Sequence, residues 1–505
     1  MDEDLLQYPD RVAETFTGKT VFITGGTGFM GKVLVEKLLR NCNGIKKILL
    51  LVRGKKGKYP KERLKEIFAG PLYDMLKNLK GADIVNNVEA IEGDVLLPNL
   101  GISKEDREML IKDVNFIFHC AATIRFDESL KKAVLMNVRG TQFMLDLAKE
   151  CKNLQVFAHV STAYCHLNER ILYEKPYPPP ADPHKVIKTV EWLPDEIIDQ
   201  ITPKILGDIP NTYAFTKALG ETLVVEAKEQ DHLPVMILRP PVVIPIWKEP
   251  IPGWTDNING PTGLLIGAGK GVIRTMYCKQ ESYADYLPVD ILVNAVLGSI
   301  FFYVSEKKND KYIYNLTSSS QYKITMEDII NIGRKVIETR MPLNGVAWYP
   351  GGSMKKSRII HLICFFFFHL IPAVLVDALL LIIGYKPVLW RVQKRIWKGF
   401  EVFEYYANNQ WDFDNEESLN IRDQLLNPRE RILYKLDGEG IDYFEYFYHC
   451  VHAARLYILK ETDDTLPAAR RHMFVMWVVD RVCKGLFIIA VLYYFYKNIL
   501  SPFLT

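Results

Sequence analysis

The chain places a tyrosine and a lysine at a spacing that suits proton transfer. Tyr213 and Lys217 are four residues apart, so on a helix they lie on the same face. An ammonium beside a phenol favours the phenolate, and we expect Lys217 to lower the pKa of Tyr213. Such a tyrosine can give a proton to a carbonyl oxygen while hydride arrives at the carbon. Ser161 or Thr162, just after an apolar run, could hold the same oxygen, and the sequence leaves open which does so.

The spacing alone is a weak signal, because the chain contains it four times. The four pairs are Tyr73–Lys77, Tyr213–Lys217, Tyr303–Lys307 and Tyr493–Lys497. Only Tyr213 follows a Ser-Thr pair at the end of an expected strand, at residues 155–160, in the N-terminal half. This context favours Tyr213 and Lys217 as the catalytic pair. The alternative is an ordinary amphipathic helix with a surface ion pair.

A glycine-rich turn near the N-terminus predicts a nucleotide site. Residues 21–24 form an expected buried strand, and residues 29–39 repeat apolar side chains at helical spacing. Glycines between them allow a tight turn and a close approach of the main chain to a pyrophosphate at the helix start. The alternative is a turn without a ligand. The residues expected around the pyrophosphate are Thr24, Gly25, Gly26, Thr27, Gly28, Phe29 and Gly31.

The next expected strands indicate which nucleotide binds. An NAD site usually offers an acidic residue at the end of the second strand, but residues 48–52 are followed by Arg53 and further basic residues. Arg53 can meet a 2′-phosphate, which favours NADPH; the alternative is a solvated basic loop. Asp94, at the end of residues 88–95, could accept a hydrogen bond from the adenine amino group. Val95 and Ala121, which follows the expected strand at 114–120, complete the candidate cofactor contacts.

Composition limits the class of protein. The 505 residues are 49% hydrophobic with a net charge of +3, which gives no indication of nucleic-acid binding. Eight scattered cysteines without a CxxC pair argue against a disulfide framework or a zinc site. The acidic N-terminus lacks an apolar core, so no secretory signal peptide is expected. Alternating strands and helices predict an α/β fold with a doubly wound parallel Rossmann sheet.

Residues 20–220 resemble an extended short-chain dehydrogenase/reductase. The motifs that carry this resemblance are TGGTGFMG at 24–31, the Gly93-Asp94 pair, HCAA at 119–122, MNVRGT around Asn137, VST at 160–162 and the Tyr213–Lys217 pair. The whole chain more narrowly resembles the alcohol-forming fatty acyl-CoA reductases, through VSTAYCH at 160–166, the long run at 238–276 and DYLPVDILVNA at 285–295. The tail after about residue 355 is similar to the sterile-type domain of that family.

The resemblance implies an activity. Long-chain fatty acyl-CoA would be reduced by NADPH in two hydride transfers, through an aldehyde, to a primary fatty alcohol of the kind used in waxes and ether lipids, with release of CoA. Tyr213 would protonate the alcohol oxygen, Lys217 would tune Tyr213 and hold the nicotinamide ribose, and Asn137 would support a proton relay. No metal is implied, and a homodimer is possible. The rivals are a membrane-bound steroid dehydrogenase-like enzyme and a non-catalytic NADPH-binding scaffold.

The expected domains follow one another along the chain. They are an N-terminal tail (1–15), a Rossmann domain with interleaved substrate elements (16–300), a substrate subdomain and linker (301–355), a mainly helical sterile-type domain (356–465) and a C-terminal membrane anchor (470–505). Arg239, Lys270 and Arg274 are candidates for binding the CoA phosphates, since anions need cationic partners. The alternative is a tight loop packed against the cofactor domain.

Residues 359–385 are mostly apolar and long enough to cross a bilayer core of about 30 Å. Because both flanks are basic, and basic residues prefer the cytosolic side, we expect a shallow hairpin bent at Pro372. The alternative is a buried helix pair. These segments predict a membrane-associated protein whose catalytic domain faces the cytosol. The endoplasmic reticulum is favoured, and peroxisome and lipid droplet remain open.

Overall fold

The structure is a computed structural model that describes residues 3–55, 57–306, 310–318 and 321–500. The chain divides into two compact units, each assembled from separate stretches of sequence. Unit 1 comprises Met1–Ile251, Ala284–Lys323 and Asn409–Ile441, and unit 2 comprises Pro252–Tyr283, Ile324–Asn408 and Asp442–Thr505. The successive domain boundaries expected from the sequence stay a prediction, because compact units and sequence domains need not coincide.

Unit 1 is built on a parallel sheet. Within the described residues its seven strands are β1 (Thr20–Thr24), β2 (Lys47–Val52), β3 (Val88–Glu92), β4 (Val114–His119), β5 (Val156–Val160), β7 (Val235–Arg239) and β11 (Ile313–Asn315). Their order is β11-β7-β5-β4-β1-β2-β3, and every neighbouring pair is parallel. The chain thus winds outward in both directions from β1, as in dinucleotide-binding folds. The expected doubly wound Rossmann sheet is confirmed.

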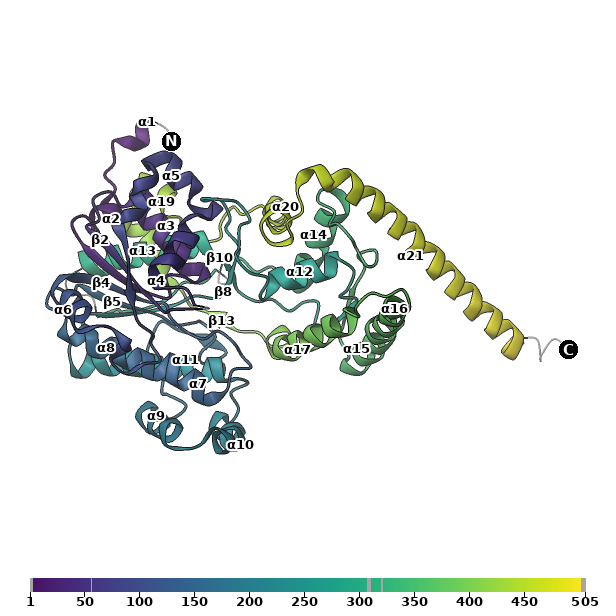
Figure 1. Cartoon of the computed structure of the whole chain (residues 1–505), viewed down its shortest axis with the longest axis horizontal. Coiled ribbons are helices and arrows are strands. Elements are labelled where there is room, and N and C mark those ends of the chain that lie inside the picture. The colour runs from purple at the N-terminus through teal and green to yellow at the C-terminus, as the bar shows by residue number, and fades with distance from the viewer. Residues whose placement is uncertain (1–2, 56, 307–309, 319–320, 501–505) are drawn as a thin grey trace. The chain divides into compact units, whose positions relative to one another are not determined.

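Helices cover both faces of this sheet, which explains why most of its strands are continuous apolar runs. Helices α6, α8 and α11 pack on one face, against β4 and β7, while α3 and α13 pack together on the other (Figure 1). The main helices of unit 1 are α3 (Phe29–Asn41), α4 (Pro60–Phe68), α5 (Asp74–Lys80), α6 (Lys104–Asp113), α7 (Leu130–Val134), α8 (Gly140–Glu150), α9 (Pro183–Trp192), α10 (Asp195–Leu206), α11 (Thr212–Gln230) and α13 (Val289–Ser305).

Shorter elements complete unit 1. They are the helices α1 (Glu3–Leu6), α2 (Arg11–Glu14), α18 (Glu416–Asn420) and α19 (Pro428–Leu433), and two parallel strand pairs, β6 (Ile171–Leu172) with β13 (Asp412–Phe413) and β8 (Val242–Ile244) with β10 (Tyr286–Pro288). Arg11 of α2 makes an ion pair of 2.6 Å with buried Glu430 of α19. This contact joins the two ends of the unit, which are far apart in sequence.

Unit 2 is mainly helical. Its helices are α12 (Pro261–Gly269), α14 (Met326–Thr339), α15 (Arg358–Phe365), α16 (Ile371–Ile382), α17 (Leu389–Asn408), α20 (Tyr443–Ala453) and α21 (Leu466–Phe495), with one parallel strand pair, β9 (Thr275–Tyr277) and β12 (Ser353–Lys355). Its apolar core gathers Val336 and Ile337 of α14, Val451 of α20 and Met473 of α21. The expected helical C-terminal part is confirmed.

The hairpin expected at Pro372 is wrong. Helices α15 and α16 are joined by the π turn η5 (Phe366–Leu370) into one helix, Arg358–Ile382, which is the single helix among the described residues that is long and apolar enough to cross a membrane. Pro372 is the second residue of α16, directly after the π turn. The wider turn offers a proline room beside the preceding carbonyls, so the helix continues. The chain reverses later, after Gly384, and α17 packs against α16.

Candidate functional site

The turn between β1 and α3 requires glycine. Gly25 has a φ of +74°, and a Cβ on it would lie 2.8 Å from the main chain at Cys120 and Ala121. A Cβ on Gly31 would lie 2.3 Å from the carbonyl oxygen of Gly25. The turn is therefore pressed between the end of β4 and the first turn of its own helix, a conformation that larger residues cannot adopt without displacement.

Helix α3 begins in a way that suits a phosphate. Its N-cap residue is Gly28, which is exposed and supplies no side-chain cap. A helix start of this kind presents main-chain N–H groups and the positive end of the helix dipole. Thr27 and Phe29 are half-buried beside it. The Thr24 side chain faces inward instead: its oxygen lies 2.8 Å from Nδ1 of His119 and accepts the N–H of Ala121 at 3.2 Å.

The candidate adenosine contacts lie at the ends of the two neighbouring strands. Arg53, after β2, is half-exposed, and its Nη1 lies 3.6 Å from Oδ2 of Asp94, after β3. Val95 is buried against Gly140, and Ala121 is half-buried after β4. The fold therefore brings Arg53 and Asp94, predicted for two different parts of the cofactor, into one ion pair at the carboxyl edge of the sheet.

The tyrosine, the lysine and the hydroxyl pair converge at the end of β5. Asn211 caps α11 by accepting the N–H of Ala214 at 2.9 Å, which starts the helix one residue before Tyr213. The Thr162 side chain lies close enough to Tyr213 to lower its pKa, while its hydroxyl donates to the carbonyl oxygen of Pro240 at 3.4 Å and accepts the N–H of Tyr164 at 3.2 Å. Nζ of Lys217 donates to the carbonyl oxygen of Val160, the last residue of β5, at 2.6 Å. Lys217 is 3% exposed, so the alternative of a surface ion pair is wrong.

Thr162 and Ser161 differ in their surroundings. Both are buried, but Thr162 contacts Tyr213, whereas the Oγ of Ser161 has no hydrogen-bond partner within the described part of the chain. The ring of Tyr213 stacks on Phe126 with the centroids 5.4 Å apart. Of the two hydroxyls, that of Thr162 therefore lies beside Tyr213, and which of them holds the substrate oxygen stays a prediction.

The expected effect of Lys217 on Tyr213 is wrong. Burial raises the pKa of Tyr213 to about 12, and the nearby Thr162 side chain offsets this only in part. Burial also lowers the pKa of Lys217 to about 8. The two residues lie on one helix, as the spacing predicts. The Lys217 ammonium, however, is directed at the Val160 carbonyl, and the effect of burial on the Tyr213 hydroxyl dominates its pKa.

The side chain of Asn137 connects two segments that border the site. Its side-chain oxygen accepts the N–H of Thr123 at 2.8 Å, and its Nδ2 donates to the carbonyl of Thr123 at 3.1 Å and to the hydroxyl of Thr216 at 3.0 Å. One amide thus ties the loop after β4 to α11, next to Lys217. In this structure the Asn137 side chain therefore positions the loop after β4 relative to α11.

Comparisons with known proteins agree with this geometry. Two family models, both described as male sterility protein, match the chain. The NAD-binding model matches residues 23–296, and the Sterile model matches residues 368–461. Fatty acyl-CoA reductase 1 of Rattus norvegicus is 39% identical over 462 residues, 92% of this chain and 89% of that protein. A putative fatty acyl-CoA reductase of Drosophila melanogaster is 36% identical over 491 residues, 96% of this chain and 93% of its own length.

The chain belongs to the fatty acyl-CoA reductase family.

Solved structures similar to this reductase share its fold. The reductase domain of a non-ribosomal peptide synthetase from Mycobacterium tuberculosis has a TM-score of 0.58 at 20% identity, covering 90% of this chain and 96% of that one. The terminal R domain of the myxalamid PKS-NRPS pathway has a TM-score of 0.57 at 18% identity, covering 88% and 92%. At these identities the likeness concerns the fold alone.

The reductase contains a buried charge cluster beneath the site, which sequence reasoning missed. Glu221 of α11 accepts two hydrogen bonds from Arg239 of β7, at 2.9 and 2.7 Å, and lies 3.2 Å from Nε2 of His166. Burial alone would raise the pKa of Glu221, but Arg239 and His166 bring it well below its usual value. Helical spacing could have indicated this residue, because Glu221 follows Lys217 by four.

This cluster corrects the role expected for Arg239. Its guanidinium is fully buried and also donates to the main-chain oxygens of Tyr173 and Lys175 at 3.0 and 3.1 Å. It therefore has no surface for a CoA phosphate. Cys165, His166 and Glu221 place three ligand-type atoms within 4.8 Å of one another. Arg239 already satisfies both oxygens of Glu221, so its positive charge opposes a cation there.

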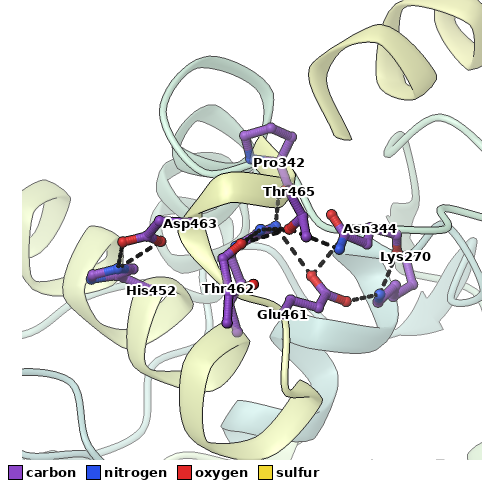
Figure 2. A network of polar contacts seen from close by, with 9 residues as sticks. Lys270, Pro342, Asn344, His452, Glu461, Thr462, Asp463 and Thr465 are labelled. Atoms are coloured by element: carbon purple, nitrogen blue, oxygen red, sulfur yellow. Dashed lines mark hydrogen bonds and ion pairs between the residues drawn. The ribbon is translucent and has the colours of Figure 1, made fainter. Parts of the chain in front are cut away.

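The two other candidates for the CoA phosphates lie in unit 2 and are also engaged. Lys270 makes an ion pair of 2.5 Å with Glu461 and donates to the carbonyl of Asn344 (Figure 2). Arg455, in the same network, holds Glu461 at 3.1 Å. Arg274 donates to the carbonyl of Tyr349 at 2.6 Å. The contacts of both cations therefore lie within unit 2, and a role of Lys270 or Arg274 in binding the CoA phosphates stays a prediction.

Replacing Gly31 by alanine tests the turn. The added Cβ would overlap the Gly25 carbonyl, so Gly31→Ala should lower the free energy of unfolding of unit 1 by about 1–3 kcal/mol and weaken binding of the nicotinamide cofactor. Denaturant titration and cofactor fluorescence measure the two effects. Gly438→Ala, also in unit 1, is the control, since a Cβ there makes only ordinary contacts, at 3.6 Å or more. Equal stability of the two variants would contradict the close approach.

Replacing Glu221 by glutamine tests the buried cluster. Glu221→Gln leaves Arg239 charged and unpaired, so the free energy of unfolding should fall by about 3 kcal/mol. Glu226→Gln, on the same helix, removes only a partly exposed pair with His184 and should change it by less than about 0.5 kcal/mol. A similar loss in both variants would show that the buried pair contributes no more than a surface pair.

Proposed function

We propose that this family member reduces long-chain fatty acyl-CoA to a primary fatty alcohol and free CoA, with NADPH as the reductant. The observation that carries the proposal is the convergence of the glycine turn after β1, Arg53 after β2 and the Thr162–Tyr213–Lys217 group after β5. These lie at the carboxyl edge of one parallel sheet, where ligands of such folds bind.

The chain's own residues fit NADPH. The main chain at Gly25, Gly26 and Gly28 turns so tightly that a Cβ on any of them would press on neighbouring protein atoms, and the start of α3 that follows presents N–H groups suited to the pyrophosphate. Arg53 would turn from Asp94 to the 2′-phosphate, and Asp94 would accept from the adenine amino group, next to Val95. When bound, NADPH supplies the hydrides that convert the acyl thioester first to aldehyde and then to alcohol.

The protein's part in the reaction concerns one oxygen. Thr162 and Tyr213 would donate hydrogen bonds to the substrate carbonyl and stabilise the charge that develops on it. In the thioester stage, collapse of the tetrahedral adduct releases CoA as thiolate. In the aldehyde stage Tyr213 gives its proton to the alkoxide, a favourable transfer because an alkoxide is far more basic than a phenolate. A raised tyrosine pKa keeps that proton in place until it is needed.

Lys217 and Asn137 would act around this proton. The Val160 carbonyl uses one of the three N–H donors of Lys217, which leaves two for the nicotinamide ribose. Asn137 fixes the loop after β4 and the adjoining turn of α11. In the proton relay expected from the sequence, it would hold these two segments in place. Ser161, buried beside Thr162, would contribute to the same pocket.

The acyl-CoA substrate is proposed from the names of the relatives, which are fatty acyl-CoA reductases at 36–39% identity. Membrane association is proposed from the apolar helix Arg358–Ile382 and from the exposed apolar end of α21, with the catalytic unit facing the cytosol, at the endoplasmic reticulum in preference to the peroxisome or lipid droplet. A homodimer stays a prediction.

Product analysis with Tyr213→Phe tests the reaction. Microsomes that carry the full chain, supplied with NADPH and acyl-CoAs of different lengths, should form primary alcohol, and Tyr213→Phe should reduce the rate by about 10²-fold or more while NADPH binding persists. Tyr493→Phe is the matched control: Tyr493 and Lys497 have the same spacing but are exposed on α21 and η9, so its rate should stay unchanged. In the third pair of this spacing, Lys307 lies outside the described residues.

Other outcomes separate the rivals. Aldehyde as the final product would limit the mechanism to one hydride transfer. No product from any acyl-CoA, with NADPH binding intact, would favour the steroid-type enzyme or the scaffold and overturn the proposed substrate.

Cofactor choice is tested at Arg53. Loss of a charge-assisted contact to the 2′-phosphate should weaken NADPH binding by about tenfold to a hundredfold in Arg53→Ala and leave NADH binding unchanged. Arg107→Ala, which removes an arginine of α6 that pairs with Glu150 of α8, is the control. Equal weakening of NADH and NADPH in Arg53→Ala would show that Arg53 does not read the 2′-phosphate.

A further inference from the structure

The helix Arg358–Ile382 of unit 2 has two chemically different faces. Every fourth residue from His361 to Asp377 is buried; these residues are His361, Phe365, His369, Ala373 and Asp377, which we call the inner stripe. The polar side chains that interrupt the apolar segment therefore all lie on the inner stripe. The other side of the helix is apolar and exposed.

The inner stripe is fastened to the folded part of unit 2. Nε2 of His369 accepts the main-chain N–H groups of Arg274 and Thr275 at 2.9 and 3.2 Å, and its Nδ1 lies 2.9 Å from Oε1 of Gln393 on α17. His361 Nδ1 lies 3.2 Å from the Thr275 hydroxyl. Each of these bonds joins the helix to strand β9, to Arg274 directly before that strand, or to α17.

Asp377 and Phe365 extend this attachment along the helix. The carboxylate of Asp377 accepts the N–H groups of Val388, Leu389 and Trp390 at 2.8–2.9 Å and so caps the start of α17. The Phe365 ring packs on Trp397 with the centroids 4.9 Å apart. Figure 1 shows α17 running beside α15 and α16.

The outer face of the helix consists of exposed apolar side chains. Its exposed large side chains are Ile359, Ile360, Leu362, Ile363, Phe366, Phe367, Phe368, Val374, Leu375, Val376, Leu379, Leu381 and Ile382. Phe367 is 55% exposed and Ile382 is 81% exposed. Soluble proteins rarely leave so large a patch uncovered, and its presence marks an interaction surface.

A transmembrane path does not fit these contacts. By length the helix could cross a bilayer, since 25 residues span about 37 Å. A crossing would draw α17 and β9 into the hydrocarbon as well, because the inner stripe is bonded to both. Helix α17 carries six charged residues, Arg391, Lys394, Arg395, Lys398, Glu401 and Glu404. Burying them in lipid is costly.

The charges beside the helix indicate which kind of partner the outer face contacts. Lys386 in the turn and Arg391, Lys394 and Arg395 on α17 are exposed near the end of the helix, and Trp390 beside them is 41% exposed. Basic residues attract anionic headgroups, and tryptophan prefers the membrane–water interface. An apolar face with such flanks is typical of a helix that lies in the plane of the interface.

We propose that the outer face of Arg358–Ile382 lies in one leaflet of a membrane with anionic lipids, parallel to its surface, while the inner stripe stays on the protein. Both ends of the helix then lie on the same side of the membrane. The proposal rests on the membrane association proposed above and gives it a geometry, and it does not depend on the reaction.

Photocrosslinking distinguishes the two faces. The full chain is made in sealed microsomes with p-benzoylphenylalanine in place of Phe367 or, as the matched control, in place of Phe365. After irradiation, peptide masses should show lipid adducts at 367 and none at 365, with phosphatidylserine and phosphatidylinositol enriched over their share of the membrane. Adducts at both positions, or none at 367 although the chain stays in the membrane fraction, would overturn the proposal. A covalent dimer through position 367 would assign the face to a second copy.

Labelling of the flanks tests the path of the helix. Ser353→Cys and Lys386→Cys are treated separately, in intact microsomes, with a thiol reagent that cannot cross membranes, and the modified peptides are identified by mass. Both should be labelled to the same extent before detergent is added. Labelling of one flank only, until detergent opens the microsomes, would show a crossing and overturn the proposal. Alcohol formation measured on the same membranes reports on the reaction independently.

Discussion

The ion pair between Glu221 and Arg239 is the contact on which the arrangement of the candidate site depends. It joins α11, which carries Tyr213 and Lys217, to the end of β7, and Arg239 extends the connection to the main chain at Tyr173 and Lys175. Both charges are buried, so water could not solvate either charge if its partner were removed. Glu221 lies one helical turn beyond Lys217, and its negative charge favours the protonated form of Lys217. It thereby opposes the effect of burial, which lowers the Lys217 pKa.

A line of hydrogen bonds connects the end of β1, directly before the glycine turn, to helix α8. Burial lowers the pKa of His119 to about 3, so its ring is neutral. The hydroxyl of Thr141 donates to the carbonyl of Asn137 at 2.8 Å, and it therefore accepts Nε2–H of His119 at 3.0 Å. Nδ1 of His119 then accepts the hydroxyl of Thr24. Each donor has one acceptor along this line, which fixes β1 relative to α8.

The sequence was sufficient for features that depend on local chemistry. The glycine turn, the parallel sheet, the helical C-terminal part and the shared face of Tyr213 and Lys217 follow from spacing and apolar runs. It was insufficient for features that depend on burial. Arg239 looks like any strand-end cation, and its partner Glu221 is 18 residues away on another element. The direction of the Tyr213 pKa depends on desolvation, which a linear spacing does not contain.

Pro372 illustrates how backbone geometry can serve two needs at once. In an α-helix, residues four apart advance by about 40° around the axis, so five buried residues at this spacing would wind almost halfway round. The π turn η5 takes up an additional residue and brings His369, Ala373 and Asp377 back over His361 and Phe365. The turn that accommodates the proline is therefore also the turn that keeps the inner stripe straight. A helix surrounded by lipid has no need of a straight polar stripe, whereas a helix with one side on protein and one on lipid cannot do without it.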